Sequence, residues 1–194
     1  KYYFIKNLHI GSYCYSYYGV KLFNVDFKDI TFKYSCGGAY GMYLSNFLTK
    51  YNNNFKFIDI GSNIGIYSLI ASENLKCKKI YAIEPVKSTF VKLKKNLKGK
   101  NSNAINCAIS SINGYGYIAV HKFDSGSSKI SKKNNKNKKY LIKRILIQNY
   151  KLFDKINSNN KLDFICKIDV EGNEKIVLNE IKKSSIYKNI KFFY

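Results

Sequence analysis

The chain of 194 residues contains no tryptophan, a single proline (Pro85) and a single arginine (Arg144). Proteins that read nucleic-acid bases rely on the bidentate guanidinium group, so this scarcity of arginine argues against such a partner, although the formal charge is +22. Lysine, asparagine, isoleucine, tyrosine and phenylalanine dominate the composition instead. A/T-rich codons encode all five, so we discount the net charge by about half as evidence for a polyanionic partner. Nucleic acid is therefore not expected as the partner.

The sequence also lacks the patterns of disulfide-rich, zinc-binding and membrane-spanning chains. Its five cysteines are an odd number without C-x-x-C spacing, and only His9 and His121 could join them as zinc ligands. No apolar run approaches the roughly 20 residues of a membrane span, and no signal peptide is expected. We expect a reduced, cytoplasmic protein in which Cys107 and Cys166 are core residues of apolar strands.

The most informative segment that is present covers residues 57–65. An apolar strand runs there into a turn that Gly61 and Gly65 bracket, and an apolar helix follows. Glycines at such a turn supply positive φ and let the backbone approach a ligand closely. Asn63, in the middle of the turn, is one of the few other residues that tolerate the left-handed region. The segment predicts a nucleotide-binding strand, turn and helix.

An acid at the end of the next apolar strand strengthens this prediction. Glu84 follows the turn by about 20 residues, where a carboxylate can hold both hydroxyls of a ribose. The turn itself reads Asp-x-Gly-x-Asn-x-Gly rather than the dinucleotide pattern Gly-x-Gly-x-x-Gly. Asp59 before the first glycine suits an ammonium group and would repel a pyrophosphate. S-adenosylmethionine carries a ribose, an amino group and a sulfonium but no phosphate, so this cofactor fits the pattern best.

Apolar periodicity predicts the remaining elements. We expect one or two strands within residues 21–35, a helix over 40–51, and a helix capped by Ser88 or Thr89 and stopped by Gly99. The residues at 104–108, 162–169 and 188–194 are predicted to be the third, fourth and fifth parallel strands. Residues 114–121 and 140–147 are predicted to be an antiparallel pair inserted before the fourth strand, with a mobile Lys/Asn loop over 129–139.

Strands that alternate with helices predict an α/β fold with a Rossmann-like, doubly wound and mostly parallel sheet. Ligands of such sheets bind at the carboxyl ends of the strands. Residues 1–54 are expected to be a strand and helix extension packed on the core. Residues 55–194 are expected to be the cofactor-binding domain, so that the whole chain forms one globular unit.

Three segments resemble the signatures of the FkbM family. They are Ile58-Asp59-Ile60-Gly61-Ser62-Asn63-Ile64-Gly65, Tyr81-Ala82-Ile83-Glu84-Pro85 and Lys167-Ile168-Asp169-Val170-Glu171-Gly172. The resemblance covers about residues 55–194 and implies an S-adenosylmethionine-dependent O-methyltransferase of class I fold. Many members of that family act on sugars or polyketides. Their fold implies seven strands, whereas the strands predicted here stop at the fifth. Either the remaining strands lie beyond the given sequence, or the protein is a truncated version with an incomplete acceptor site.

Candidate site residues follow from the strand ends and from this resemblance. For the cofactor they are Asp59, Gly61, Ser62, Asn63, Gly65, Glu84, Pro85, Cys107 and Ala108. Asp169 and Glu171 are candidates for the base or for an acceptor anchor, and together they could contribute to a Mg²⁺ or Mn²⁺ site. Glu171 could instead be a helix N-terminal acid, and His121 is either an alternative base or an exposed bystander. Ser127-Ser128 after Gly126 resembles a family segment near the site, although a flexible loop is an equally good interpretation.

The predicted function is therefore O-methylation of a sugar hydroxyl on a surface glycan or its precursor. An anionic or lipid-linked glycan would suit the lysine tract, although that tract could equally be a solvated loop. Two alternatives stay open. A nucleic-acid methyltransferase would share the cofactor half, but no Asn-Pro-Pro-Tyr-type base-flipping motif is present. A truncated, non-catalytic remnant that binds the cofactor would explain a sheet of five strands.

Overall fold

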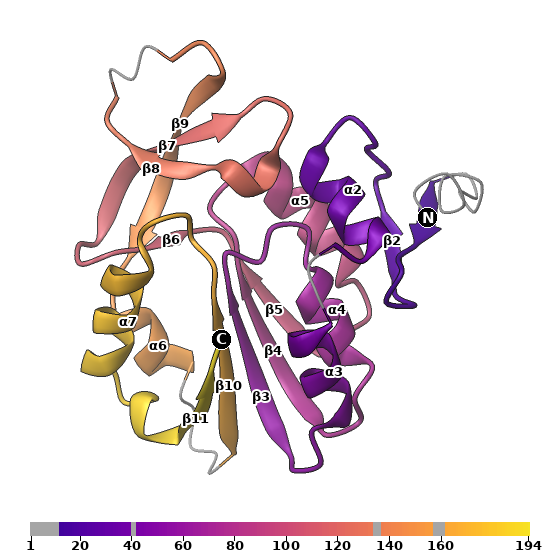
Figure 1. The fold of residues 1–194 in the computed structure, drawn as a ribbon. Helices are drawn as coiled ribbons and strands as arrows, with labels where there is room; N and C mark the ends of the chain where they lie inside the picture. The colour runs from indigo at the N-terminus through magenta and orange to yellow at the C-terminus, as the bar shows by residue number, and fades with distance from the viewer. Residues whose placement is uncertain (1–11, 40–41, 134–136, 157–161) are drawn as a thin grey trace.

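The computed structural model describes residues 12–39, 42–133, 137–156 and 162–194. Its centre is a five-stranded sheet in which every strand pair is parallel (Figure 1). In spatial order the strands are β11 (Ile190–Phe193), β10 (Asp163–Ile168), β3 (Phe55–Ile60), β4 (Cys77–Ile83) and β5 (Ser102–Ile105). The predicted parallel sheet is confirmed, and so are its five core strands, with shifts of a few residues at their ends.

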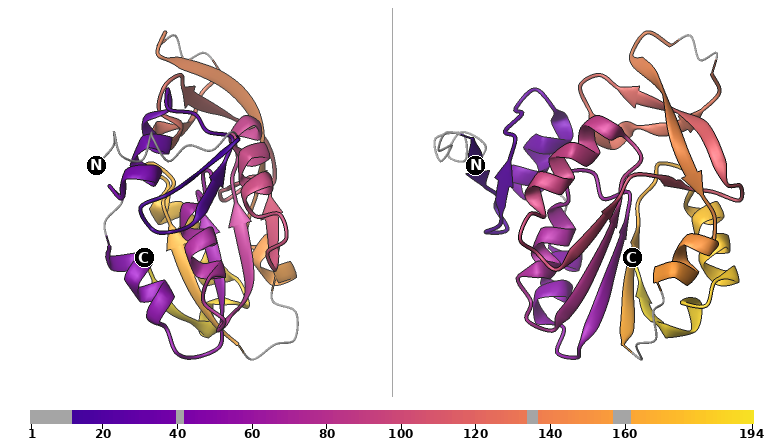
Figure 2. Two further views of the ribbon diagram at one scale, coloured as in Figure 1. Left: turned by 90° about the vertical axis from the view of Figure 1, so that its right-hand side faces the viewer. Right: turned by 180° about the vertical axis from the view of Figure 1, so that it is seen from behind.

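Helices cover both faces of this sheet (Figures 1 and 2). All six residues of β3 are buried, which is typical of a central parallel strand. Phe55 and Phe57 pack into one apolar cluster, and Ile58 and Ile60 pack into a second cluster on the opposite face. The first cluster includes residues of α3 (Tyr43–Lys50), α4 (Ile66–Ser72) and α5 (Lys87–Asn96), and the second includes residues of α6 (Lys151–Ile156) and α7 (Glu174–Lys183). The fold is therefore doubly wound.

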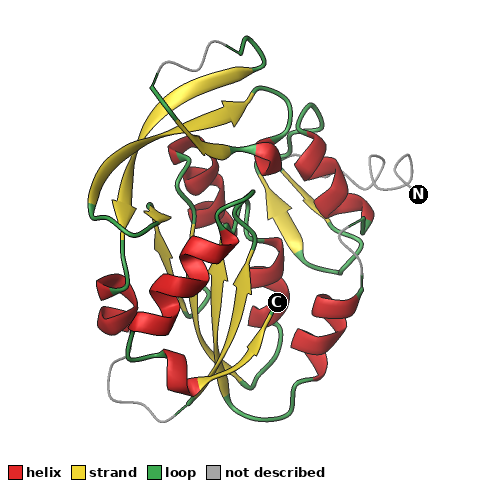
Figure 3. Ribbon diagram, turned by 60° about the vertical axis from the view of Figure 1, so that its left-hand side comes forward, coloured by secondary structure: helices red, strands yellow, loops and turns green. Residues whose placement is uncertain are grey.

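The strand order places the switch point of the sheet between β3 and β10. The chain adds β4 and β5 on one side of β3 and then returns to add β10 and β11 on the other side. Connections diverge at such a point and leave a crevice beyond the carboxyl ends of the strands. A second sheet stands over this edge (Figures 1 and 3). Its strands, in order, are β6 (Ala108–Ile109), β9 (Tyr140–Gln148), β7 (Gly114–His121) and β8 (Lys129–Ser131).

The predicted antiparallel pair is confirmed as β7 and β9. The expected loop over 129–139 was wrong at its start, because β8 pairs there with β7. Residues 134–136 of that tract lie outside the described residues. In the parts of the chain that the structure describes, no helix is long and apolar enough to cross a membrane.

The segment before the core contains a helix that the sequence did not predict. Strands β1 (Tyr13–Tyr15) and β2 (Lys21–Phe23) form an antiparallel pair, but α2 (Ile30–Gly37) follows where a strand was expected. The side chain of Asp29 accepts from the backbone N–H of Thr31 and caps the start of α2. Gly38, at φ 74°, closes its end. These two caps outweigh the alternating apolar pattern that indicated a strand.

Two further expectations were also wrong in detail. The third core strand ends at Ile105, because the Asn106 side chain donates to the carbonyls of Glu84 (2.8 Å) and Pro85 (3.0 Å). Ala108–Ile109 then pairs with β9 instead, and the buried Cys107 lies between the two strands. Helix α5 begins at Lys87 after Val86, with no side-chain cap, so neither predicted serine nor threonine cap forms.

Candidate functional site

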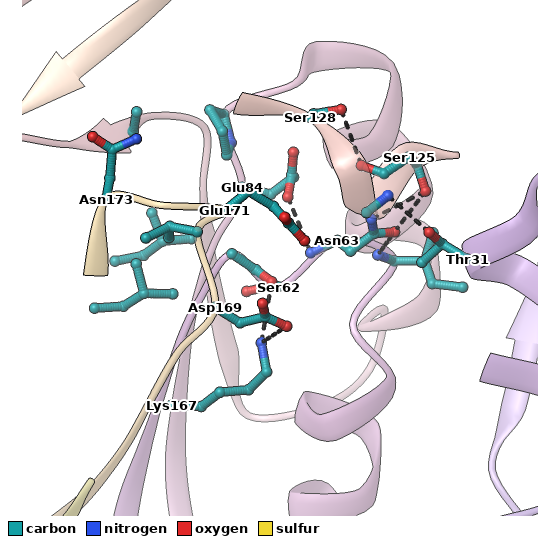
Figure 4. A pocket seen from close by; sticks show the side chains of 18 of the residues that line it. Thr31, Ser62, Asn63, Glu84, Ser125, Ser128, Lys167, Asp169, Glu171 and Asn173 are labelled. Carbon is teal, nitrogen blue, oxygen red and sulfur yellow. Dashed lines mark hydrogen bonds and ion pairs between the residues drawn. The ribbon is translucent and has the colours of Figure 1, made fainter. Parts of the chain in front are cut away.

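A pocket opens at the carboxyl ends of β3, β4 and β10, beneath the second sheet (Figure 4). Its cavity volume is about 120 Å³, roughly ten times the space that one water molecule needs. The predicted site residues that line it are Gly61, Ser62, Asn63, Glu84, Pro85, Cys107, Ala108, Asp169 and Glu171. Asp59, Gly65 and His121 are not among the lining residues. Most of the predicted set is thus brought together at one place.

The turn after β3 has the backbone conformation that the sequence predicted. Gly61 has φ 75°, Asn63 has φ 50° and Gly65 has φ 89°. A Cβ on Gly61 would overlap the carbonyl oxygen of Asp169, so only glycine lets the turn lie against the end of β10. The backbone N–H of Asp169 also donates to the carbonyl of Ile60 at 3.0 Å. The glycine therefore fixes the distance between the turn and the candidate base.

Glu84 connects the turn to the end of β4. Its Oε2 accepts from the backbone N–H of Asn63 at 3.0 Å, and its Oε1 accepts from that of Val86 at 2.8 Å. Burial raises the pKa of the Glu84 carboxyl to about 7, against the lowering effect of these two bonds. Each carboxylate oxygen has a second lone pair, so the group still has acceptor capacity for a ligand. Glu84 thus shapes the turn as well as lining the pocket.

Lys167 is a pocket residue that the sequence reasoning did not single out. Its ammonium lies 3.4 Å from Asp59 Oδ1 and 3.3 Å from Asp169 Oδ2, and it donates to the carbonyl of Gly61 at 3.3 Å. Burial opposes its charge, but the two carboxylates outweigh that effect and the pKa of Lys167 is raised. A lysine within an otherwise apolar strand, at the start of the third motif, was the available signal.

Asp59 lies beneath the pocket rather than at its wall. Its side chain is 1% exposed, and its Oδ2 accepts from the hydroxyl of Ser68 at 2.7 Å. Together with the ion pair to Lys167, this bond makes Asp59 part of the support of the site. The sequence placed Asp59 correctly at the strand end. It could not show that Asp59 would be absent from the pocket lining.

Asp169 and Glu171 lie at the mouth of the pocket (Figure 4). The side chain of Asp169 is 55% exposed while one of its oxygens faces Lys167. Glu171 has φ 51°, an uncommon conformation for a residue other than glycine. Burial, followed by the carboxylates of Asp169, Glu174 and Asp124, raises the pKa of Glu171. The acid that accepts from the backbone before α7 is Glu174, which bonds Val170 and Gly172, and not Glu171.

A short segment after β7, residues 124–128, includes the 3₁₀ turn η1 (Ser125–Ser127) and lines one side of the pocket with Ser125, Gly126 and Ser128. The Asn63 side-chain amide donates to Ser125 Oγ at 3.0 Å, which joins this segment to the turn after β3. Thr31 in α2 donates to Asp124 Oδ1 at 2.6 Å and accepts from the Gly126 N–H at 2.8 Å. Three distant parts of the chain therefore meet here through side-chain hydrogen bonds.

The geometry supports neither His121 as the base nor a metal ion at this site. The Nδ1 of His121 accepts from the Phe123 N–H at 3.3 Å, and its ring packs against Tyr140 outside the pocket lining. Within the described residues, no group of three histidine, cysteine, aspartate or glutamate side chains could hold a metal ion. The predicted contribution of Asp169 and Glu171 to a Mg²⁺ or Mn²⁺ site is thus not supported.

The charge of the pocket is opposite to that of the chain. Glu84, Asp169 and Glu171 supply carboxylates to its lining, and Lys167 supplies the opposing ammonium. The chain as a whole carries a formal charge of +22. An acidic pocket in a strongly basic protein favours a cationic ligand over a phosphate-bearing one.

Among the solved structures to which the chain is similar in part are two methyltransferases. A SAM-dependent methyltransferase from Agrobacterium tumefaciens is 14% identical, with a TM-score of 0.35 over 50% of this chain and 33% of its own. A SAM-dependent methyltransferase from Leishmania major is 22% identical, with a TM-score of 0.25 over 32% of this chain and 26% of its own. The chain thus matches about a third or less of each structure, and overlaps this small bear on no functional assignment.

No curated protein matches the chain. The family model that matches is not that of the FkbM family, so the resemblance to that family rests on the three motifs alone. That model, described as the Vibrio cholerae RfbT protein, matches residues 3–194, and the chain therefore belongs to the RfbT family.

Proposed function

We propose that the chain is an S-adenosylmethionine-dependent methyltransferase. The observation that carries this proposal is the acidic pocket at the switch point of the sheet, in a chain of charge +22. A sulfonium and an ammonium are attracted by Asp169 and by the ionised forms of Glu84 and Glu171, whereas the phosphates of a dinucleotide are repelled. The positive-φ turn after β3 and the acid after β4 provide the places for the amino acid part and the ribose.

In this proposal the residues divide into three roles. Gly61, Ser62 and Asn63 offer close backbone approach, and Glu84 accepts from the ribose hydroxyls. Pro85, Cys107 and Ala108 line the remaining wall of the cofactor space. Asp59 and Lys167 act from beneath, because they hold the end of β10 and the turn together.

The acceptor is proposed to be a sugar hydroxyl of a surface glycan or its precursor. Methyl transfer needs the acceptor oxygen in line with the sulfonium methyl, so positioning supplies much of the rate. The hydroxyl proton needs a base, and Asp169 is proposed for it because its exposed carboxylate lies at the pocket mouth. Glu171, next to it, is proposed to anchor the acceptor. His121 is the weaker candidate for the base, since it does not line the pocket.

Calorimetric titration with S-adenosylmethionine, its demethylated product and NAD tests the cofactor. We expect the first two to bind and NAD to give no heat. Glu84→Gln should weaken the binding of S-adenosylmethionine and of its product by at least tenfold. The amide nitrogen of glutamine cannot accept a hydrogen bond from the ribose or from the turn, and a lost charged hydrogen bond costs about 1.5–3 kcal/mol. Glu73→Gln is the matched control, because Glu73 pairs with Lys100 away from the pocket. No binding to the wild type, or tight binding of NAD, would remove the proposal.

A nucleic-acid methyltransferase is the second candidate, and the net charge of +22 is the observation that favours it. Fluorescence anisotropy with a labelled single-stranded RNA distinguishes the two. A methyltransferase acting on RNA should bind with an affinity that falls steeply as salt rises. Weak binding with a shallow salt slope leaves the glycan acceptor as the better candidate.

A further inference from the structure

Two buried cysteines outside the pocket lie in direct contact. Cys14 is in the middle of β1 and Cys36 is in the last turn of α2. Their sulfur atoms are 3.4 Å apart, and both side chains are fully buried. Both are free thiols, and the proposed chemistry of the pocket uses neither of them.

The backbone on both sides of this pair is held in place. The N–H of Tyr17, which follows β1, donates to the carbonyl of Cys36 at 2.8 Å. A Cβ on Gly38 would overlap the ring of Tyr17, so the end of α2 packs closely on the same segment. The short distance between the sulfurs is therefore set by the junction of two elements and not by two freely moving side chains.

We propose that Cys14 and Cys36 form a modification site, a reversible disulfide made by exchange with an external disulfide such as glutathione disulfide. The Cys14 thiolate attacks one glutathione sulfur, and the first glutathione thiolate leaves. The Cys36 thiolate then attacks Cys14 in the mixed disulfide and releases the second glutathione. Two protein thiols are oxidised, one glutathione disulfide is reduced to two thiols, and the two protein protons pass to the leaving thiolates.

The environment of the pair supports this order of attack. The hydrogen bond from Cys36, which outweighs burial, lowers the pKa of Cys14, while the pKa of Cys36 is raised. The thiolate is the nucleophile in exchange, so the lowered pKa favours Cys14 as the attacking sulfur. Since both sulfurs are buried, exchange in the folded protein requires β1 and β2 to open. A two-stranded sheet is a marginal structure that can open locally.

The proposed disulfide would restrain α2, the helix that forms part of the pocket wall. Thr31 and Ser35 of α2 line the pocket, and Cys36 is the next residue after Ser35. A cross-link to β1 would hold the end of α2 and restrict the unfolded chain between the two cysteines. The oxidised protein should therefore be more stable, with the wall of the pocket less able to move.

The test uses the full chain, first folded and then during refolding, in glutathione disulfide and in reduced glutathione. We expect oxidation to remove two hydrogen atoms by intact mass, and a non-reducing peptide map to join Cys14 to Cys36. The melting midpoint should rise by about 5–10 °C and return on reduction.

Cys107→Ser and Cys166→Ser are matched controls that keep the cross-link, whereas Cys14→Ala and Cys36→Ala should each abolish it. The peptide map of the wild-type chain identifies the cross-link without any variant, so the test stands even if a cysteine variant fails to fold. A protein that stays fully reduced under both conditions, or that joins other cysteines, overturns the proposal, and neither result depends on the cofactor.

Discussion

Single atoms decide how the pocket is built. The turn after β3 approaches β10 so closely that one added carbon at Gly61 would meet the Asp169 carbonyl. The same turn is held by Glu84 through the Asn63 N–H and by Lys167 through the Gly61 carbonyl. At the residue scale the site is thus one connected set of contacts, and each contact can be tested by a substitution with a matched control.

Gly61→Ala should be strongly destabilising, and Gly99→Ala should not. Both glycines have similar positive φ, 75° and 79°, and both substitutions carry the roughly 1–2 kcal/mol cost of an L residue in that region. Gly99 has no atom within 4 Å of its would-be Cβ, whereas Gly61 faces the Asp169 carbonyl. We expect Gly61→Ala to lose about 1–3 kcal/mol more than Gly99→Ala in urea unfolding. Equal losses would show that the close approach is unimportant.

Glu84 should make the stability of the protein fall as pH rises. Its pKa is about 7 in the folded protein against an ordinary 4.5, so between these values the folded chain keeps a proton that the unfolded chain releases. The free energy of unfolding then decreases with pH over this window, by about 3 kcal/mol in total. Urea unfolding from pH 5 to pH 8 measures the free energy of unfolding of the wild type and of Glu84→Gln. The excess of the wild-type value over that of the variant should shrink toward high pH. Parallel curves would contradict the assignment.

At the scale of elements, the sequence predicted those features whose signals are local. The buried strands β3 and β4, the positive-φ turn and the pair β7–β9 each follow from neighbouring residues. Helix α2 was missed because its alternating apolar residues resemble a strand, and its identity depends on Asp29 and Gly38 at its ends. The pairing of β6 with β9 was missed because the break at Asn106 depends on carbonyls more than 20 residues away.

The part of the site that could not be predicted is the contact between α2 and the segment after β7. Thr31 and Asp124 are 93 residues apart, and Asn63 and Ser125 are 62 residues apart. Serine, threonine and asparagine at such separations carry no periodic signal, so only the folded chain shows that they meet. Lys167 was overlooked for a related reason, since its partner Asp59 becomes a neighbour only when β10 lies beside β3.

Thr31→Val should weaken the attachment of the segment after β7. The substitution keeps the shape of the side chain but leaves the Gly126 N–H and the Asp124 carboxylate each with one partner fewer, at about 1–3 kcal/mol. Thr49→Val is the matched control, because that hydroxyl donates only to carbonyls of its own helix, and it should change stability by about 0.5 kcal/mol or less. Thermal unfolding measures both, and equal effects would mean that the attachment contributes nothing.

For the whole molecule, charge is distributed unevenly between surface and site. Lysine and arginine together number 34 against 12 acidic residues, so the surface repels itself. The ion pair between Lys167 and Asp59 joins an ammonium that is 5% exposed to a carboxylate that is 1% exposed, and salt screens such a buried pair much less than surface charges. Raising the ionic strength should therefore relieve the surface repulsion and leave the support of the pocket in place.

Added salt should consequently stabilise this protein. From about 10 mM to 150 mM sodium chloride the Debye length falls from roughly 30 Å to 8 Å, which removes most of the repulsion between distant lysines. We expect the melting midpoint to rise over this range and then to level off, because nearby charges are screened last. Sucrose at equal osmolality is the control, since it is excluded from the protein surface without screening charge. A midpoint that stays flat or falls in sodium chloride would mean that local ion pairs, such as Lys92 with Asp26 and Lys100 with Glu73, outweigh the net charge.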